Sequence, residues 1–289
     1  KMFVSGSTGA GVAEYTLSTA FDVSTASHVD TLSVSAQDTY PKGHAFNSDG
    51  TKMFVVGLTG KDVNEYTLST GFDVSTASFV DSFSVSSQET APVGITFNTD
   101  GTKMFVIGHS GADVNEYTLS TGFDVSTASY DSSFSVSSQE RYPSSVTFSN
   151  DGKKMFVIGI NDDEVNEYSL STGFDVSTAS FVGNFSVSPG VPAPNCLAFN
   201  NDGTKMFVGD HLGKDINEYT LTTPFSLVDV SGEHTGDVID TSSTSNKDSD
   251  VDGDTLTVTQ IKKSGGSNSA VSSGTTNTNG TSVTGTYGV

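Results

Sequence analysis

The chain has 289 residues, which is long enough for one large domain and a smaller one. It carries 34 acidic and 13 basic residues, so its net charge is −21 and we expect no nucleic-acid partner, because such a surface repels phosphate backbones. The single cysteine excludes a disulfide within the chain, and no apolar run reaches the roughly 18 residues that cross a membrane. Hydrophobic residues make up only 34% of the chain, which is typical of thin β-layers joined by polar loops.

The dominant feature of the sequence is an internal repeat with a period of 51 residues. A Lys-Met-Phe-Val string, a Glu-Tyr pair and a phenylalanine recur in one register. They begin at Lys1, Lys52, Lys103, Lys154 and Lys205, at Glu14, Glu65, Glu116, Glu167 and Glu218, and at Phe21, Phe72, Phe123, Phe174 and Phe225. Because the chain opens inside a unit, we expect both termini to be cuts from a longer protein, so a missing signal peptide does not argue against secretion.

One unit, taken from Pro92 onward, contains four short strand patterns separated by turn patterns. An Asp-Gly pair at 100–101 supplies the positive φ of a tight hairpin between the first two patterns. The second pattern is almost continuously apolar, as in a strand buried on both faces, and the fourth alternates with period two, as in a half-exposed strand. The expected strands are Gly94–Phe97, Lys103–Ile107, Val114–Leu119 and Ser133–Ser137.

These patterns predict an all-β fold, because no segment shows helical periodicity. Four antiparallel strands per unit are typical of a β-propeller blade, whereas the coils of a β-solenoid, the second possibility, usually have shorter periods. Five blades can be counted, and the first is incomplete because the chain begins after the position of its inner strand. Closed rings usually have about six to eight blades, so we expect further repeats upstream.

The amino-acid sequence of the repeat also resembles that of a known family. The run Pro-x-Gly-Ile-x-Phe-x-x-Asp-Gly-Thr-Lys-Met-Phe-Val at 92–106, followed by Asp-Val-Asn-Glu-Tyr at 113–117, is similar to YVTN-type propeller repeats. The resemblance covers residues 1–232. It implies blade architecture and no particular function, because such propellers include surface proteins and enzymes.

The copies of the repeat differ mainly in two sets of loops, which antiparallel topology places on one face. The first set joins second and third strands and comprises 5–11, 57–62, 108–113, 159–164 and 209–215. The second set leads into the inner strands and comprises 38–42, 89–93, 140–144 and 191–195. Rigid scaffolds commonly carry function on such loops, although neutral drift explains their variation equally well.

We therefore expect ligand binding on this variable face, around the central channel. Tyr40 and Tyr142 offer flat amphipathic surfaces, and Arg141 offers a fork of hydrogen-bond donors. Lys42, His109 and His211 complete the candidate ligand-binding residues because they lie in or beside the same loops.

Other recurring residues have structural interpretations. The carboxylates of the Glu65 type could form a ring of acids, but their place inside a strand favours cross-strand hydrogen bonding. Phe72 and Asp73 are expected to anchor a loop and cap a turn, and Cys196 is expected to be a small buried hydrophobe. His44, like His109 and His211, has no metal-ligand spacing and is expected on the surface or in the channel. No catalytic motif is recognisable.

After about Gly232 the period ends and the composition shifts to Ser, Thr, Asn and Gly. Four carboxylates at alternate positions supply the oxygen ligands that Ca²⁺ prefers, and they belong to Asp248, Asp250, Asp252 and Asp254. An EF-hand is excluded because its twelfth position holds Thr259 instead of Glu and no helical pattern flanks the loop. An acidic hydrated turn explains the cluster as well as calcium does.

This segment resembles VCBS and cadherin-like repeats of large bacterial surface adhesins, through Asp-Val-Asp-Gly-Asp-Thr-Leu-Thr-Val-Thr at 250–259 and Gly-Thr-Ser-Val-Thr-Gly-Thr-Tyr-Gly at 280–288. The resemblance covers 237–289 and implies a partial β-sandwich-like module whose Asp-rich turns hold calcium. The expected domains are therefore propeller blades over 1–232, cut at the N-terminus, and this partial module over 233–289.

The sequence predicts a non-enzymatic, secreted or cell-surface bacterial protein. Its propeller would bind a glycan or a surface protein, its C-terminal segment would act as a stalk, and neither would insert into a membrane. The rival is a propeller hydrolase or lyase acting on polysaccharide or lactone, for which the densest group of acids is Asp162, Asp163 and Glu164. A third possibility is a structural spacer whose blades bind nothing.

Overall fold

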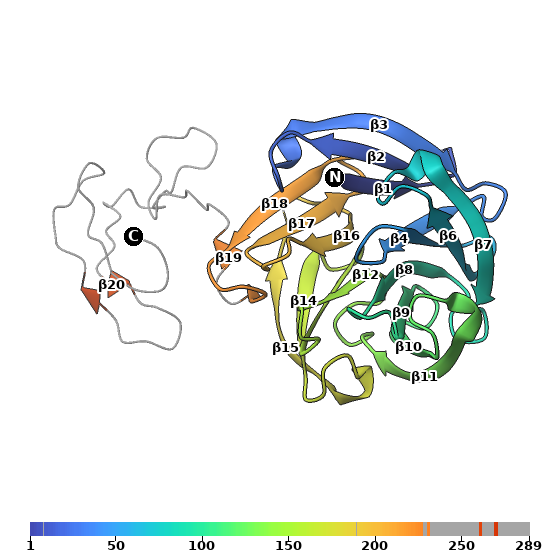
Figure 1. Cartoon of the computed structure of the whole chain (residues 1–289). Coiled ribbons are helices and arrows are strands. Elements are labelled where there is room, and N and C mark those ends of the chain that lie inside the picture. Colours follow the sequence, from blue (N-terminus) through green and yellow to red (C-terminus); the bar gives the residue numbers. More distant parts are fainter. Residues whose placement is uncertain (8, 189, 228–229, 232–259, 262–268, 271–289) are drawn as a thin grey trace. The chain divides into compact units, whose positions relative to one another are not determined.

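The computed structural model of the chain describes residues 1–7, 9–188, 190–227, 230–231, 260–261 and 269–270. The chain divides into two units, Lys1–Val230 and Ser231–Val289. In the first unit, five antiparallel sheets stand as blades around a common centre, which confirms the all-β propeller (Figure 1). The predicted calcium ligands Asp248 to Asp254 lie outside the described residues, and so does most of the predicted module at 237–289, of which β20 (Gln260–Ile261) and β21 (Ser269–Ala270) pair with each other.

Four blades have four strands each, and blade 1 has three. Blade 1 is β1 (Met2–Gly6), β2 (Gly11–Leu17) and β3 (Ala26–Ser33); blade 2 is β4 (Pro41–Phe46), β5 (Lys52–Gly57), β6 (Asp62–Leu68) and β7 (Ala77–Ser84); blade 3 is β8 (Pro92–Phe97), β9 (Lys103–Gly108), β10 (Asp113–Leu119) and β11 (Ala128–Ser135); blade 4 is β12 (Pro143–Phe148), β13 (Lys154–Gly159), β14 (Glu164–Leu170) and β15 (Ala179–Ser186); blade 5 is β16 (Pro194–Phe199), β17 (Lys205–Asp210), β18 (Ile216–Leu221) and β19 (Val230–Ser231). The only helices among the described residues are short 3-10 turns, and none could span a membrane.

Local chemistry explains the first two strands of each blade. The inner strand begins at a proline, which has no N–H to donate and is therefore suited to the first strand position. Asp100 accepts a hydrogen bond from the N–H of Thr102 and Gly101 has a φ of 73°, so the predicted hairpin forms. The second strand is buried from Met104 to Gly108, as its continuous apolar pattern predicts.

The fourth strand begins earlier than the sequence predicts. Asp73 caps a 3-10 turn, η2 (Val74–Thr76), by accepting a hydrogen bond from the N–H of Ser75, and β7 starts directly after it. In blade 3 the corresponding strand, β11, begins at Ala128, whereas the expected strand begins at Ser133. Because β11 is exposed along most of its length, burial imposes no apolar pattern on residues 128–132, and they give no periodic signal.

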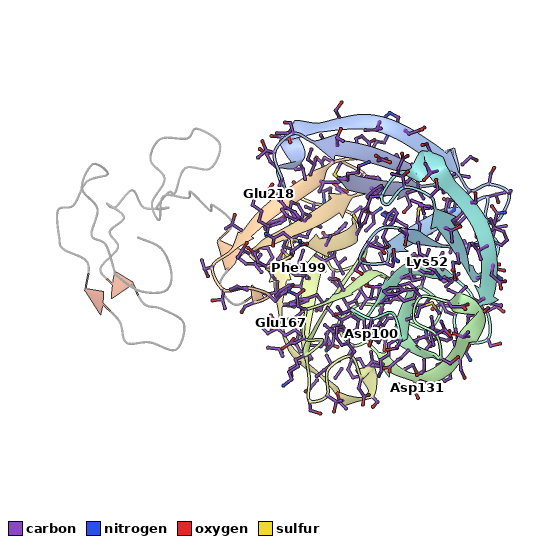
Figure 2. All side chains as sticks on the ribbon, viewed as in Figure 1. Lys52, Asp100, Asp131, Glu167, Phe199 and Glu218 are labelled. Atoms are coloured by element: carbon purple, nitrogen blue, oxygen red, sulfur yellow. The ribbon has the colours of Figure 1, made fainter. Side chains whose placement is uncertain are left out.

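Each complete outer strand contains a β-bulge. In β7, Phe79 lies opposite Tyr66 and Asp81 lies opposite Glu65, so Val80 has no partner between them. Figure 2 shows the equivalent Asp131 on the rim of the propeller. The bulged residues are Val29, Val80, Asp131 and Val182.

A lysine and a glutamate join each blade to the next. Lys52 Nζ lies 2.7 Å from Glu65 Oε1 on the adjacent strand and donates to the carbonyl oxygen of Phe123 in the next blade at 2.6 Å. Glu65 Oε2 accepts the N–H of Val125, also in the next blade, at 3.0 Å. The predicted cross-strand bonding of these glutamates is confirmed, and it extends between blades.

The ring closes with five blades, so the expectation of six to eight is wrong. Lys205 Nζ in blade 5 donates to the carbonyl oxygen of Phe21 in blade 1 at 3.1 Å, which repeats the bond that Lys52 makes to Phe123. The rings of Phe21 and Phe207 stack across the same seam with centroids 6.4 Å apart.

Aromatic side chains pack against one another between blades. Between blades 2 and 3, the ring of Phe97 lies 4.4 Å from that of Phe54 and 5.4 Å from that of Phe123. The seam between blades 5 and 1 contains only two such rings among the described residues, since β1 is the inner edge of its sheet, and Phe21 remains 37% exposed.

Two single-residue predictions are wrong. Cys196 is exposed on β16, although its Sγ lies against Gly209, because β16 faces the blade that has three strands among the described residues. His44 is half-buried and not an isolated residue, since its Nδ1 lies 3.1 Å from Ser5 Oγ and its ring contacts those of Phe3 and Phe46.

Candidate functional site

The variable face is built by two loop sets that hydrogen-bond to each other, as the topology predicts. The N–H of His109, directly after β9, donates to the carbonyl oxygen of Ala91, directly before β8, at 3.1 Å. The same bond joins Leu58 to Tyr40, Ile160 to Tyr142 and His211 to Ala193. Every candidate ligand-binding residue therefore lies on this face.

Buried carboxylates hold these loops in place, and sequence reasoning did not assign them this role. Glu89 is fully buried and accepts backbone N–H groups of Ala91, Ser110 and Gly111 at 2.7 to 3.1 Å. Asp38 does the same in blade 2. The signal in the sequence was an acid repeated at 51-residue spacing two residues before Tyr40, Ala91 and Tyr142. We call Asp38, Glu89 and Glu140 the loop anchors.

Two pairs of candidate residues are brought together near the channel. Lys42 Nζ lies 4.6 Å from the ring centroid of Tyr40, which is a cation–π distance. His109 meets the ring of Tyr142 edge-on with centroids 6.0 Å apart. Tyr40 is 45% exposed and Tyr142 is 48% exposed, so both rings remain accessible.

The two pairs also influence each other across blade 3. Burial, together with the charge of Lys42, lowers the pKa of His109 below its usual value, and the charge of Glu89 opposes this shift. The imidazole is therefore neutral at pH 7, and its Nε2 is buried with no hydrogen-bond partner among the described residues. Tyr40, Lys42, His109 and Tyr142 together form what we call the aromatic track.

Arg141 and Tyr142 border a surface groove of about 780 Å³ in blade 4. Its other walls come from the segment before Arg141 and from the β13–β14 loop. The lining residues are Ser137, Ser138, Gln139, Arg141, Tyr142, Asn161 and Asp162. This blade-4 groove combines one aromatic ring with many hydrogen-bonding groups.

The loop anchor beside this groove differs from the others. Glu140 accepts the N–H of Tyr142 through Oε1, but its buried Oε2 accepts no hydrogen bond among the described residues. Asp162 stands where blade 3 has Gly111, whose N–H binds the anchor. Burial and then the charge of Asp162 raise the pKa of Glu140 above its usual value, although nearby backbone N–H groups oppose this shift.

His211 stands apart from the other candidates. It is exposed in blade 5, and no hydrogen bond or ring contact links its side chain to the aromatic track in the described part of the chain. The described residues also contain no group of three or more His, Cys, Asp or Glu side chains placed to hold a metal ion.

No family model and no curated protein matches this chain. Among solved structures, it is similar to a putative 6-phosphogluconolactonase from Bacteroides uniformis, with 13% identity, a TM-score of 0.50 and coverage of 78% of this chain and 64% of that one. A protein from Lactobacillus plantarum gives 12% identity, a TM-score of 0.50 and coverage of 76% and 63%. The chain thus spans less than two thirds of the length of either protein, and identities this low show the propeller fold alone.

Proposed function

We propose that the propeller is the recognition domain of a secreted or cell-surface protein and that it binds a glycan on the variable face. The blade-4 groove carries this proposal. A sugar ring presents an apolar face of C–H groups and a rim of hydroxyls, so a flat aromatic ring beside amide, carboxylate and guanidinium groups matches it. Tyr142 supplies the ring, and Arg141, Asn161 and Asp162 supply donors and acceptors.

Two contacts also hold Tyr142 in place at the groove. His109 supports the edge of the Tyr142 ring, and Glu140 fixes the backbone N–H of Tyr142 at 2.7 Å. Groups held in place by packing lose little entropy on binding, which favours affinity.

A glycan array probed with the whole chain, with and without calcium, tests this proposal. We expect saturable binding to one class of sugar and about tenfold weaker binding after Tyr142→Ala. Tyr130→Ala is the matched control, since Tyr130 is 43% exposed on β11 in the neighbouring blade and away from the groove. No binding under either condition would favour a structural spacer instead.

A hydrolase or lyase acting on polysaccharide is the second candidate, and Glu140 is the observation that favours it. A carboxyl group with a raised pKa beside a second carboxylate is the pair that glycoside cleavage requires. Because Glu140 is fully buried, this activity requires the loop at 160–163 to open. Release of reducing ends that Glu140→Gln abolishes and Glu89→Gln preserves would establish it, and no release from any polysaccharide would exclude it.

We further propose that residues 233–289 belong to an adhesin-type stalk that binds calcium through Asp248, Asp250, Asp252 and Asp254. The proposal rests on the alternating carboxylates and on the resemblance to VCBS and cadherin-like repeats. Calorimetric titration of the chain with Ca²⁺ should show uptake that Asp250→Asn with Asp252→Asn removes. No uptake, or uptake unchanged in that variant, would contradict the assignment.

A further inference from the structure

The residue directly before the inner-strand proline alternates in size around the ring. It is Tyr40 in blade 2, Ala91 in blade 3, Tyr142 in blade 4 and Ala193 in blade 5. Blades 2, 3 and 4 follow one another around the centre through β4, β8 and β12 (Figure 1). Blade 3 therefore carries a small side chain at the position that holds an exposed tyrosine ring in blades 2 and 4, and we call the place of this missing ring the gap.

Each tyrosine beside this gap is paired with a nitrogen-bearing side chain. On one side, Lys42 lies over the Tyr40 ring, and on the other side, His109 contacts the Tyr142 ring. His109 is also bonded through its backbone to Ala91, and its pKa responds to the charge of Lys42. The aromatic track thus crosses blade 3 and ends at the blade-4 groove.

We infer that the aromatic track binds an extended, neutral oligosaccharide chain, with one sugar ring in the gap over Ala91 between Tyr40 and Tyr142. This inference rests on the proposed glycan recognition and specifies its ligand. A chain is favoured over a single sugar because two aromatic rings on different blades can each stack on a separate unit.

Charge favours a neutral chain over an acidic one. The net charge of −21 repels polyanions at long range, and the buried anchor Glu89 lies beneath the gap. The positively charged side chains here are Lys42 in the track and Arg141 beside Tyr142. Two such charges are too few to reverse the negative field of the protein.

The dependence of affinity on chain length tests the inference. Calorimetry would use neutral gluco- and manno-oligosaccharides of about one to six units. We expect affinity to rise with length until the chain spans the track. Tyr40→Ala should abolish the rise and leave the affinity for the shortest ligands unchanged, whereas Tyr142→Ala should weaken binding at every length.

Filling the gap gives a second test with a matched control. Ala91→Tyr should weaken the binding of long oligosaccharides about tenfold or more, because it places a third ring in the gap. Ala193→Tyr makes the same change on the same face in blade 5 and should have no effect. Neither alanine has a positive φ, and tyrosine occupies the same position in blades 2 and 4, so both variants should fold. Thermal unfolding verifies this.

The outcomes separate this inference from the proposal on which it rests. Absence of binding to oligosaccharides of every length and charge would overturn both. Binding without length dependence would overturn the extended chain alone. Equal effects of Ala91→Tyr and Ala193→Tyr would do the same. Stronger binding of oligouronates than of neutral chains of equal length would overturn the neutral assignment.

Discussion

At the scale of single residues, blade 5 differs from blade 3 in where it places a loop-holding carboxylate. The carboxylate and the residue without a polar side chain have exchanged positions. In blade 3 the anchor Glu89 lies against Gly108, where an added Cβ would come within 2.4 Å of the carboxyl carbon. In blade 5, Val191 replaces the anchor and Asp210 replaces the glycine, and the Asp210 carboxylate accepts the N–H of Leu212 at 2.9 Å. A single carboxylate therefore binds the backbone of the loop in both blades, from the position of Glu89 in blade 3 and from that of Asp210 in blade 5.

This exchange predicts a compensating pair of substitutions. Glu89→Val leaves buried N–H groups without acceptors and should destabilise the fold by about 2–4 kcal/mol. Gly108→Asp alone clashes with Glu89 and should cost a similar amount. The double variant reproduces blade 5 and should recover most of the stability in urea unfolding. Additive losses in the double variant would contradict the exchange.

His44 predicts a pH dependence of stability. Burial lowers its pKa from 6.5 to about 4, so between these values the unfolded chain binds a proton that the folded chain does not. The free energy of unfolding should therefore fall by up to about 3 kcal/mol as the pH drops from 6.5 to 4. His44→Ile copies Ile95 of blade 3 and should remove this component, as urea unfolding at several pH values would show. A parallel pH profile in the variant would contradict the assignment.

The candidate site could be predicted only in part from the sequence. Differences between repeats located the variable face, and Tyr40, Lys42, His109 and Tyr142 do meet there. The roles of Glu89 and Glu140 could not be predicted, because their partners are backbone N–H groups that every residue type carries. His44 was misplaced because its contacts Ser5 and Phe3 come from the neighbouring blade, which spacing along the chain does not reveal.

At the scale of elements, the lysine and glutamate of the second and third strands are the main polar contact between blades. In blade 3, Glu116 bonds both Lys103 and the N–H of Val176 in blade 4, and its side chain is 1% exposed. In blade 5, Glu218 still pairs with Lys205, but its side chain is 26% exposed at the seam with blade 1. The same pair is thus buried within the ring and partly solvated at its closure.

This difference gives a matched pair of variants. Glu116→Ala leaves Lys103 and a buried N–H without a partner and should destabilise the propeller by about 3–5 kcal/mol. Glu218→Ala should cost at most about 1 kcal/mol, since water replaces the lost contact. Chemical denaturation compares the two, and equal losses would show that the seam is as tightly packed as the other interfaces.

Strand prediction succeeded where burial imposes a pattern. The continuous apolar run Met104 to Ile107 and the alternation before Val136 both reflect contact with neighbouring blades. It failed over 128–132, where exposure leaves the side chains free to be polar. The number of blades could not be predicted either. Ring closure depends on the angle between neighbouring sheets, and the repeats, which are nearly identical in sequence, do not reveal this angle.

At the scale of the whole molecule, the seam between blades 5 and 1 is the least packed part of the ring. Among the described residues β1 pairs only with β2, and on the facing strand β16 the side chains of Asn195, Cys196 and Ala198 are exposed. The corresponding positions on β8 are mostly buried. The ring is therefore expected to open first at this seam.

Grafting an inner strand onto blade 1 tests this expectation. A copy of residues 89–102, placed directly before Lys1, keeps the period and brings a phenylalanine between Phe207 and Phe21. The melting temperature should rise by roughly 2–4 °C for each kcal/mol gained, because the new strand pairs with β1 and covers the seam. In a control graft, serine replaces the copies of Ile95 and Phe97, and this graft should give little increase. An equal rise with both grafts would show that burial at the seam is not the cause.

The bulge in the outer strands has a consequence for behaviour in crowded solution. A regular strand at the rim would offer its free N–H and C=O groups to the rim of another molecule, which is how amyloid-like assembly starts. The unpaired residue at Val80 or Asp131 interrupts that template in the middle of each complete outer strand and increases its twist. We therefore expect the bulges to disfavour strand pairing between the rims of two molecules.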